Sequence, residues 1–447
     1  MKMSLFPKNE AATRSVRLAL AASRIALACA LMACAAQAAN PPGGSGWVST
    51  DGPNQPMGTA KGIHPGRVAW DFDPKAALWN GTGDWWADAN NNQAAIDQMF
   101  SKTIRCVAGE AADAAAWKQL FHSFNQRRGK GDVGYAAGER IAVKINENNT
   151  SSHADTGEIN ASPQMVLALL KQLVNQAGIA QSNITVFDAS RFITDNVYNK
   201  CHGQFPGVVF VDNCGGDGRV QATYQANAIL YSKDCGLARG LATCLVQAAY
   251  VIDFAVLKGH VGQGVTFCAK NFYGATSIAS DWHKNAHDYF GAKADGSPSY
   301  MAFTDFLAHK DMGGKTLLFV MDALYGCKVV NGPPGPKWNL PPFNGGWPSS
   351  LFASEDGVAL DSVALDFFRS EYPSGQDLRY SDMYLHEAAQ ANNPPSGTVY
   401  DPSRSGARCL SLGVHEHWNN ATNKAYSRNL GPGTGIELVA VHAAPAK

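Results

Sequence analysis

Cys-x-x-Cys pairs are absent from this sequence, although it contains 10 cysteines in 447 residues. An iron–sulfur cluster or a structural zinc site built on that spacing is therefore not expected. An excess of positive charge is absent as well, because 37 basic residues are balanced by 37 acidic ones. Without a basic surface the chain has no electrostatic footprint for nucleic acid, so we expect no nucleic-acid partner.

Long apolar runs are also missing, apart from residues 18–38. Basic residues precede this run and a small-residue triplet ending at Ala38 closes it, a pattern typical of a cleaved bacterial secretory signal. Arg24 interrupts the run, which is too short for a membrane anchor. We predict cleavage after Ala38, a periplasmic or secreted protein, and no transmembrane segment in the mature chain. A lipoprotein signal with a lipid anchor at Cys34 is the alternative.

Removal of residues 1–38 leaves eight cysteines and a net charge near −4, because five basic residues and one acidic residue are lost. An even number of cysteines in an oxidising compartment favours disulfide bonds. The pairs Cys201–Cys214 and Cys235–Cys244 are close enough in the sequence to close short loops. These two pairs are our candidate disulfides.

Hydrophobic residues make up 45% of the chain, enough for a large core in one elaborate domain or in two lobes. Residues 39–65 are rich in Gly, Pro, Ser and Asn, and predict an extended lead-in. We place an N-terminal helical segment at 66–135, an α/β domain at 136–370 and a C-terminal extension at 371–447. The helical segment is rich in tryptophan, and we assign these side chains to the core: Trp70, Trp79, Trp85 and Trp86.

Alternating strands and helices are predicted along the rest of the chain. A helix from Gln93 to Arg105, capped near Asn92, comes first. Predicted strands are Arg140–Asn146, Asn183–Ser190, Gly207–Asn213, Ala228–Tyr231, Tyr250–Lys258 and Lys315–Ala323, and predicted helices are Ser162–Gly178 and Ser299–His309. Strands separated by helices imply an α/β fold with a mostly parallel sheet covered by helices on both faces.

Polar residues gather at the carboxyl ends of these strands, where parallel sheets bind ligands. One such residue alone is more often a cap or a loop anchor, so the prediction of a small-molecule pocket depends on their coincidence. The candidate substrate-binding residues are Lys144, Asn146, Asp188, Ser190, Arg191 and Asp322. Lys258 and His260 end a further strand, and they share one of its faces because they are two residues apart.

Proton transfer is the chemistry that these groups favour. His260 is the best general acid or base, because its ordinary pKa lies near neutrality and Lys258 could shift it. Lys270 could serve as a Schiff-base amine, as a cofactor-attachment amine or as an anion-binding charge. Arg191 suits bidentate recognition of a carboxylate. Together they suggest a small acid as substrate, with His260, Lys270 and Lys258 as the catalytic set.

Two histidine pairs have spacings that suit metal ligation. His283 and His287 stand four apart, on one face of a predicted helix, and His415 and His417 lie on one face of a strand. Neither pair has a third ligand that the sequence assigns. Two carboxylates lie nearby in the chain: Asp356 is expected to cap a helix, and Asp361 is a candidate polar group facing the site.

Several motifs together resemble one bacterial family, the domain of unknown function 362, over residues 136–370. They are RIAVKINEN, SPQMVLALLKQLVNQAG followed by ITVFDASR, LKGHVGQGVTFCAKNFYG, and SEDGVALDSVALDF. The chain has Gly357 where many relatives have proline. It also lacks the cysteine-rich ferredoxin module fused to some members, which removes the main reason to infer electron transfer.

That family is distantly similar to the nickel-pincer lactate racemase superfamily, and this similarity implies a nickel-pincer cofactor. A histidine ten positions before a cofactor-bearing lysine belongs to the superfamily's site, and His260 and Lys270 have that spacing. The superfamily's other acid/base histidine falls at about Ser190. A chain that is exported unfolded cannot carry a cofactor made in the cytoplasm. The nickel-pincer cofactor is therefore not our favoured expectation, and a bound metal ion is the alternative.

Two classes of function remain open. The first is a periplasmic enzyme, isomerase-like or racemase-like, that acts on a small organic acid by proton transfer at His260 and Lys270. The second is a periplasmic solute-binding or scaffold protein in which the same polar groups hold a ligand and no bond is broken. The sequence does not predict the oligomeric state.

Overall fold

The computed structural model describes residues 51–233, 238–277, 299–373 and 378–442. Its strands are β1 (Met57–Gly58), β2 (Arg67–Phe72), β3 (Ile141–Lys144), β4 (Ile184–Asp188), β5 (Val209–Asp212), β6 (Val220–Gln221), β7 (Tyr224–Leu230), β8 (Ala238–Ala242), β9 (Tyr250–His260), β10 (Gly264–Val265), β11 (Thr316–Cys327), β12 (Ser350–Ser354), β13 (Val414–His415) and β14 (Glu437–Ala440). Its helices are α2 (Gln93–Ala108), α3 (Asp113–Arg127), α4 (Pro163–Lys171), α5 (Asp195–Gln204), α6 (Thr243–Gln247), α7 (Cys268–Asn271), α8 (Ala302–Ala308), α9 (Gly357–Glu371), α10 (Leu378–Ala389) and α11 (Ser427–Leu430).

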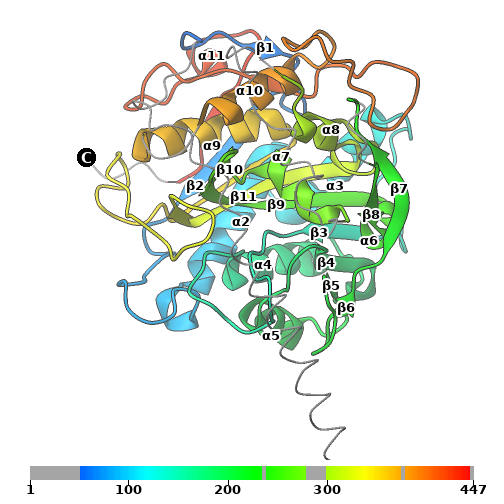
Figure 1. The fold of residues 1–447 in the computed structure, drawn as a ribbon. Helices are drawn as coiled ribbons and strands as arrows, with labels where there is room; N and C mark the ends of the chain where they lie inside the picture. The colour runs from blue at the N-terminus through cyan, green and yellow to red at the C-terminus, as the bar shows by residue number, and fades with distance from the viewer. Residues whose placement is uncertain (1–50, 234–237, 278–298, 374–377, 443–447) are drawn as a thin grey trace, which may run out of the picture. The chain divides into compact units, whose positions relative to one another are not determined.

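A ten-stranded, mostly parallel sheet is the frame of the fold, which confirms the predicted α/β class (Figure 1). Its order is β14-β2-β12-β11-β9-β3-β4-β5-β6, with β10 paired to β9. Strand β12 runs antiparallel to both neighbours, and β10 is antiparallel to β9, while the other pairs are parallel. Every residue of β11 is buried, as expected for a central strand covered on both faces.

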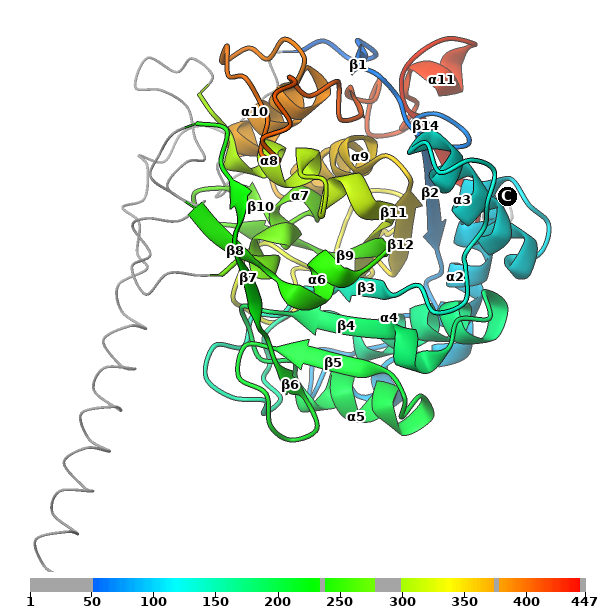
Figure 2. The same ribbon diagram turned by 90° about the vertical axis from the view of Figure 1, so that its right-hand side faces the viewer.

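Helices cover both faces of the sheet (Figures 1 and 2). Strand β3 shows how the sequence builds the two layers, because its side chains alternate between faces. Ala142 joins the core beneath α8, α9 and α10, whereas Ile141 and Val143 join the core formed with α2, α3, α4 and α5. The predicted caps hold: Asn92 accepts a hydrogen bond from the backbone N–H of Ala95 at the start of α2.

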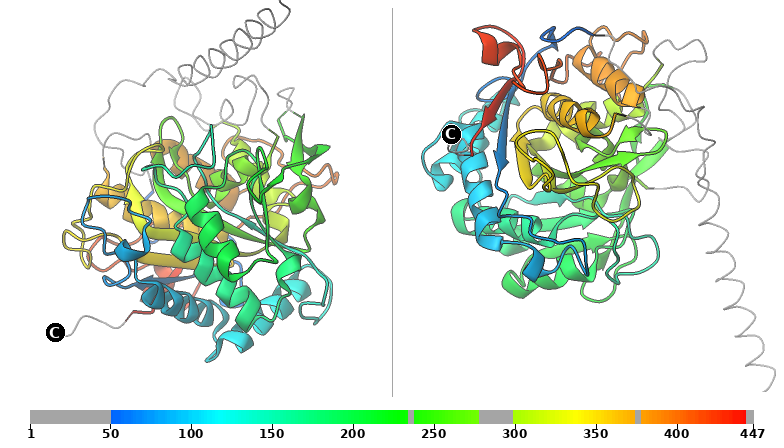
Figure 3. Two further views of the ribbon diagram at one scale, coloured as in Figure 1. Left: turned by 90° about the horizontal axis from the view of Figure 1, so that it is seen from below. Right: turned by 90° about the vertical axis from the view of Figure 1, so that its left-hand side faces the viewer.

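Both ends of the described chain add to this frame. Strand β2, in the predicted helical segment, pairs with β12 and β14, so that segment contributes a sheet strand as well as α2 and α3. Figure 3 shows α2 beside β2. The lead-in contains β1, which pairs with β13 of the C-terminal extension. Trp70, Trp79 and Trp85 are buried, as predicted, while Trp86 is partly exposed.

Three sequence expectations need correction or fall outside the described residues. The strand predicted at Ala228–Tyr231 is part of β7, which pairs antiparallel with β8 apart from the main sheet. The disulfide Cys201–Cys214 is wrong, because Cys201 is buried on α5 and Cys214 is exposed after β5, and both thiols are free. Cys244 is also a free thiol, and Cys235 lies outside the described residues.

Residues 1–38, which carry the predicted signal, are not among the described residues. Among the helices that the structure describes, none combines the length and the apolar character needed to cross a membrane.

Candidate functional site

Lys144 lies at the carboxyl end of β3, between β9 and β4 in the sheet. It is the last residue of β3 and is fully buried. Its Nζ donates to the carbonyl of Ile145 (2.5 Å), to Asp188 Oδ2 at the end of β4 (3.1 Å) and to Asn271 Oδ1 (3.1 Å). The structure therefore brings together Lys144 and Asp188, which the sequence placed at two neighbouring strand ends.

Asn271, which sequence reasoning missed, fixes α7 over these strands. Its Nδ2 donates to the Lys144 carbonyl (3.0 Å) and to Asp253 Oδ1 of β9 (2.6 Å), and its Oδ1 accepts from Asn146 Nδ2 (3.2 Å). Gly274, just past α7, lies so close that a Cβ there would stand 2.8 Å from Lys144 Nζ. The helix that carries Lys270 is therefore held against the carboxyl end of β3 and against Asp253, the residue of β9 that pairs with Lys144.

Glu147 is the second residue that sequence reasoning missed. It follows β3, is 3% exposed, and neither of its carboxylate oxygens has a hydrogen-bond partner among the described residues. Burial, reinforced by the nearby Asp188, raises the pKa of Glu147 well above its ordinary value. Burial therefore favours the carboxylic acid form of Glu147 over the carboxylate, and that form is a proton donor.

Lys258 and Lys270 are both amines whose charge is disfavoured. Burial lowers the pKa of Lys258 to about 8, and its Nζ donates to the Ile159 carbonyl (3.0 Å). Burial, and then the positive charges of Arg191 and Lys258, lower the pKa of Lys270 well below its ordinary value. These cations therefore lie near enough to repel one another, which is a favourable setting for an anion.

His260 has a defined neutral tautomer. Its Nδ1 lies 2.7 Å from the Val261 carbonyl, which can only accept, so Nδ1 carries the proton and Nε2 is the basic nitrogen. Burial, and then the charge of Lys270, lower the pKa of His260 well below its ordinary value. The side chain keeps partial exposure even so, at the end of β9. The neutral imidazole is the form that a general base needs, and an anion bound beside it would raise its basicity by offsetting the nearby cations.

The model of the family described as "domain of unknown function (DUF362)" matches residues 141–366, about half of the chain. This chain belongs to the DUF362 family. The match runs from β3 to α9, and so contains every strand-end residue described above. No curated protein shows significant similarity to the chain.

Other predicted site residues of the DUF362 region anchor its helices. Asp322 accepts from the backbone N–H groups of Ser162, at the start of α4, and Leu324 (2.8 and 3.0 Å). Asp361 accepts from the N–H groups of Cys268 and Ala269 at the start of α7. These carboxylates therefore hold helix N-termini, and their role as groups that face a ligand stays a prediction. Asp356 caps α9, as predicted.

Ser190 and Arg191 follow β4 within the same DUF362 region. The Ser190 hydroxyl and backbone N–H both donate to Asp188 Oδ1 (3.1 and 3.2 Å), and Arg191 donates to the Ser190 carbonyl (2.9 Å). Ser190 stands at the position that the resemblance gives to a second acid/base histidine, and a serine hydroxyl does not take a proton at neutral pH. The described residues therefore lack, at this position, one of the two histidine bases that accompany the nickel-pincer cofactor in that superfamily, and they fit the cofactor poorly.

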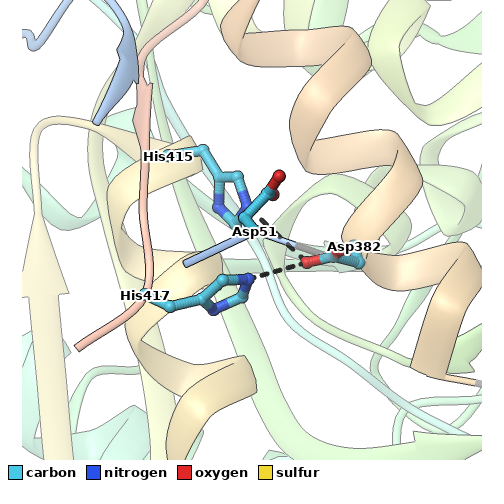
Figure 4. A group of neighbouring side chains, drawn as sticks. All are labelled: Asp51, Asp382, His415 and His417. Carbon is cyan, nitrogen blue, oxygen red and sulfur yellow. Dashed lines mark hydrogen bonds and ion pairs between the residues drawn. The ribbon is translucent and has the colours of Figure 1, made fainter. Parts of the chain in front are cut away.

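The pair His415 and His417 lies C-terminal to the DUF362 region, on and after β13. Both rings approach Asp382 of α10, with Asp51 beside them (Figure 4). Sequence reasoning found the two histidines of this cluster and missed Asp51 and Asp382. His283 and His287 lie outside the described residues. A separate cavity beside β14 is lined by Trp70, His442 and Lys424 among others, and includes none of the residues at the carboxyl ends of β3, β4 and β9.

Proposed function

We propose that this protein is an enzyme that binds a small organic acid at the carboxyl ends of β3, β4 and β9 and moves a proton on it. The observation that carries the proposal is the set of amines near the end of β3: Asn271 of α7 binds Lys144, the charges of Lys144 and Lys258 act on Lys270, and the charge of Lys270 acts on the neutral His260. Asp188 is ionically paired with Lys144 (3.1 Å), so it compensates only part of this positive charge. A carboxylate of the substrate would supply the rest.

His260 is the proposed general base. Its Nε2 is the basic nitrogen, and the neighbouring cations keep the imidazole neutral at physiological pH. A base must be unprotonated before it acts, and the cations would stabilise the negative charge that grows on the substrate when a proton leaves. Because its pKa is lowered, Lys270 is a stronger acid than an ordinary lysine when it is protonated, so it would return a proton to the substrate, which is the pattern of an isomerase or racemase.

Glu147 is the proposed partner for a polar group of the substrate. Its buried carboxyl group has unused hydrogen-bonding capacity among the described residues. A hydroxyl or carbonyl oxygen of a hydroxy or keto acid would satisfy it, whereas an apolar substituent would leave it unsatisfied. This asymmetry favours oxygenated acids over simple fatty acids.

Deuterium exchange tests the enzyme directly. Small hydroxy, keto and dicarboxylic acids are incubated with the protein in D2O, and loss of C–H signal is followed by proton NMR. We expect exchange with the wild type, and a loss of at least about 100-fold in His260→Gln, within the range for removal of a general base. His202→Gln and Lys75→Met, at surface positions, are the matched controls.

Binding without exchange would identify the alternative function. If an acid stabilises the wild type but not Lys270→Met, and no exchange occurs with any acid, the protein is a solute-binding protein. If no acid stabilises the wild type and none exchanges, the anion site itself is refuted.

We also propose that the protein is exported. The support is the basic and then apolar pattern of residues 1–38. Intact-mass analysis of the periplasmic fraction is expected to give a chain that begins at Ala39. A chain that begins at Cys34 and carries lipid would establish the anchor instead, and a full-length chain in the cytoplasm would refute export.

A further inference from the structure

We propose that Asp51, Asp382, His415 and His417 form a structural zinc site that fastens the C-terminal segment to helices α9 and α10. This inference is independent of the proposed enzyme activity, because none of the four residues lies at the strand ends. Asp51 precedes β1, Asp382 is on α10, and the two histidines lie at and just after β13. Three of them follow the DUF362 match in the chain, and Asp51 precedes it.

The four ligand atoms already lie near one another. All are within 4.8 Å of each other, and Asp382 Oδ1 is 3.0 Å from His417 Nε2 and 3.6 Å from His415 Nε2. Ligands bound to zinc at about 2.0–2.1 Å in a tetrahedron are about 3.4 Å apart. The observed spacings bracket that value, so small side-chain rotations would complete the coordination.

Partners on α9 direct both rings toward the centre. His417 Nδ1 contacts Asp366 Oδ1 (2.8 Å), and His415 Nδ1 contacts Ser362 Oγ (2.8 Å). Ser362 and Asp366 are four apart, on one face of α9. With Nδ1 occupied on each ring, Nε2 is the nitrogen that points at Asp382, as Figure 4 shows. Metal-bound histidines usually have such a partner on their second nitrogen.

The hydrogen bonds around His415 indicate that the site binds a cation. The Ser362 hydroxyl donates its single hydrogen to the Val358 carbonyl (2.7 Å), so it must accept from His415 Nδ1. In the neutral ring, His415 Nε2 then carries a lone pair, and that lone pair faces the Asp382 carboxylate at 3.6 Å. The nitrogen is buried and makes no hydrogen bond among the described residues. Two acceptors that face each other in a buried site are satisfied together by a cation between them.

The ligand set and the burial indicate the metal and its role. Two imidazole nitrogens and two carboxylates suit Zn²⁺ better than Ca²⁺ or Mg²⁺, which prefer oxygen ligands alone. His415 is 0%, His417 2% and Asp382 4% exposed, so four protein ligands close the site without an open position for substrate. A closed four-ligand site is the structural type of zinc site.

The remaining neighbours hold the carboxylates in place. His386 Nε2 forms an ion pair with Asp51 and lies 3.6 Å from Asp382 Oδ2. Asp366, which orients His417, also accepts from the N–H of Trp418 and the hydroxyl of Tyr426 (both 2.9 Å). A metal here would join the segment before β1, the segment after β13 and α10. These segments come from opposite ends of the chain.

Metal content and affinity test the site in the exported, processed protein. We expect inductively coupled plasma mass spectrometry to find one zinc per chain. After chelation, zinc titrated alone should bind by calorimetry and restore the Tm that the chelator lowers. His417→Gln should bind zinc at least about 100-fold more weakly than the wild type. Asp366 only positions His417, so Asp366→Asn should bind zinc about 10- to 100-fold more weakly.

His153→Gln is the matched control, because His153 is also buried between two aspartates, Asp212 (2.8 Å) and Asp217 (3.1 Å). It should keep wild-type zinc affinity. If the histidine variants do not fold, Asp51→Asn, on a partly exposed side chain, replaces them. A wild type that binds zinc no better than these variants, that shows no chelator effect on Tm, or that carries calcium or magnesium instead would overturn the proposal.

Discussion

Replacement of Lys144 by methionine tests whether the strand-end site is a closed, low-dielectric environment. Methionine keeps most of the side-chain volume and removes the charge. The side chains of Lys144 and Asp188 are 1% and 3% exposed, and their charged atoms are 3.1 Å apart. Loss of one partner leaves the other charge buried and uncompensated, which costs about 3–5 kcal/mol in such settings.

The structure places the cost of Lys144→Met near the lower end of that range. Asp188 keeps three hydrogen bonds, from the backbone N–H groups of Glu147 and Ser190 and from the Ser190 hydroxyl. We therefore expect a loss of about 3 kcal/mol in the free energy of unfolding. Asp188→Asn should cost less in the Lys144→Met background than in the wild type, because the charge that needed Lys144 is then gone.

Urea unfolding measures both quantities, with fluorescence and circular dichroism followed together to check for a two-state transition. A loss below about 1 kcal/mol for Lys144→Met would show that the pair behaves like a solvated surface pair. Additive losses in the double variant would show that the two side chains are not coupled. Either result would refute a closed site at the end of β3.

Two further predictions concern the same residues. Glu147→Gln should stabilise the fold at pH 7 and leave it unchanged near pH 4. Because the folded-state pKa of Glu147 is raised, the folded protein holds a proton that the unfolded chain releases, so its free energy of unfolding falls as pH rises above about 4.5, and glutamine removes this loss. Urea unfolding at the two pH values measures the effect, and equal stability differences at both would contradict it. Gly274→Ala should destabilise the fold by about 1–3 kcal/mol, because its Cβ would stand 2.6 Å from Asp188 Oδ1 and 2.8 Å from Lys144 Nζ. The control Gly203→Ala on α5, where a Cβ would have no atom within 4 Å, should be neutral or stabilising in thermal unfolding. If Gly274→Ala changed the stability as little as Gly203→Ala does, α7 would not be held against the strands.

Local signals in the sequence predicted most of the strands, the helix caps and the polar residues at the strand ends. An apolar run that ends in Lys258 and His260 identifies β9, and the acidic residue before the run that begins at Val358 identifies the cap Asp356. These features depend on neighbours in the chain. The carboxyl ends of parallel strands then meet by the geometry of the sheet, which is how Lys144 and Asp188 were predicted to be close.

Contacts between distant segments could not be predicted in this way. Asn271 meets Lys144 across 127 positions, and nothing in the local sequence marks that asparagine. His417 meets Asp366 and Asp382 across 51 and 35 positions, so the spacing of the two histidines revealed only part of the cluster. The prediction of the disulfide Cys201–Cys214 failed although the two residues are close in the sequence. Cys201 is buried on α5 and Cys214 is exposed after β5, so their side chains do not meet.

The ionisation state of His260 tests the central claim most directly, because it requires no knowledge of the substrate. With ¹⁵N-labelled histidine, NMR of the wild type and of His260→Gln assigns the two ring nitrogens of this residue. We predict a neutral ring at pH 7 with the proton on Nδ1, a pKa below the ordinary value of histidine, and a pKa that rises when Lys270 is replaced by methionine. A ring that is charged at pH 7, or a pKa that does not respond to Lys270→Met, would contradict a neutral base set among cations at the strand ends.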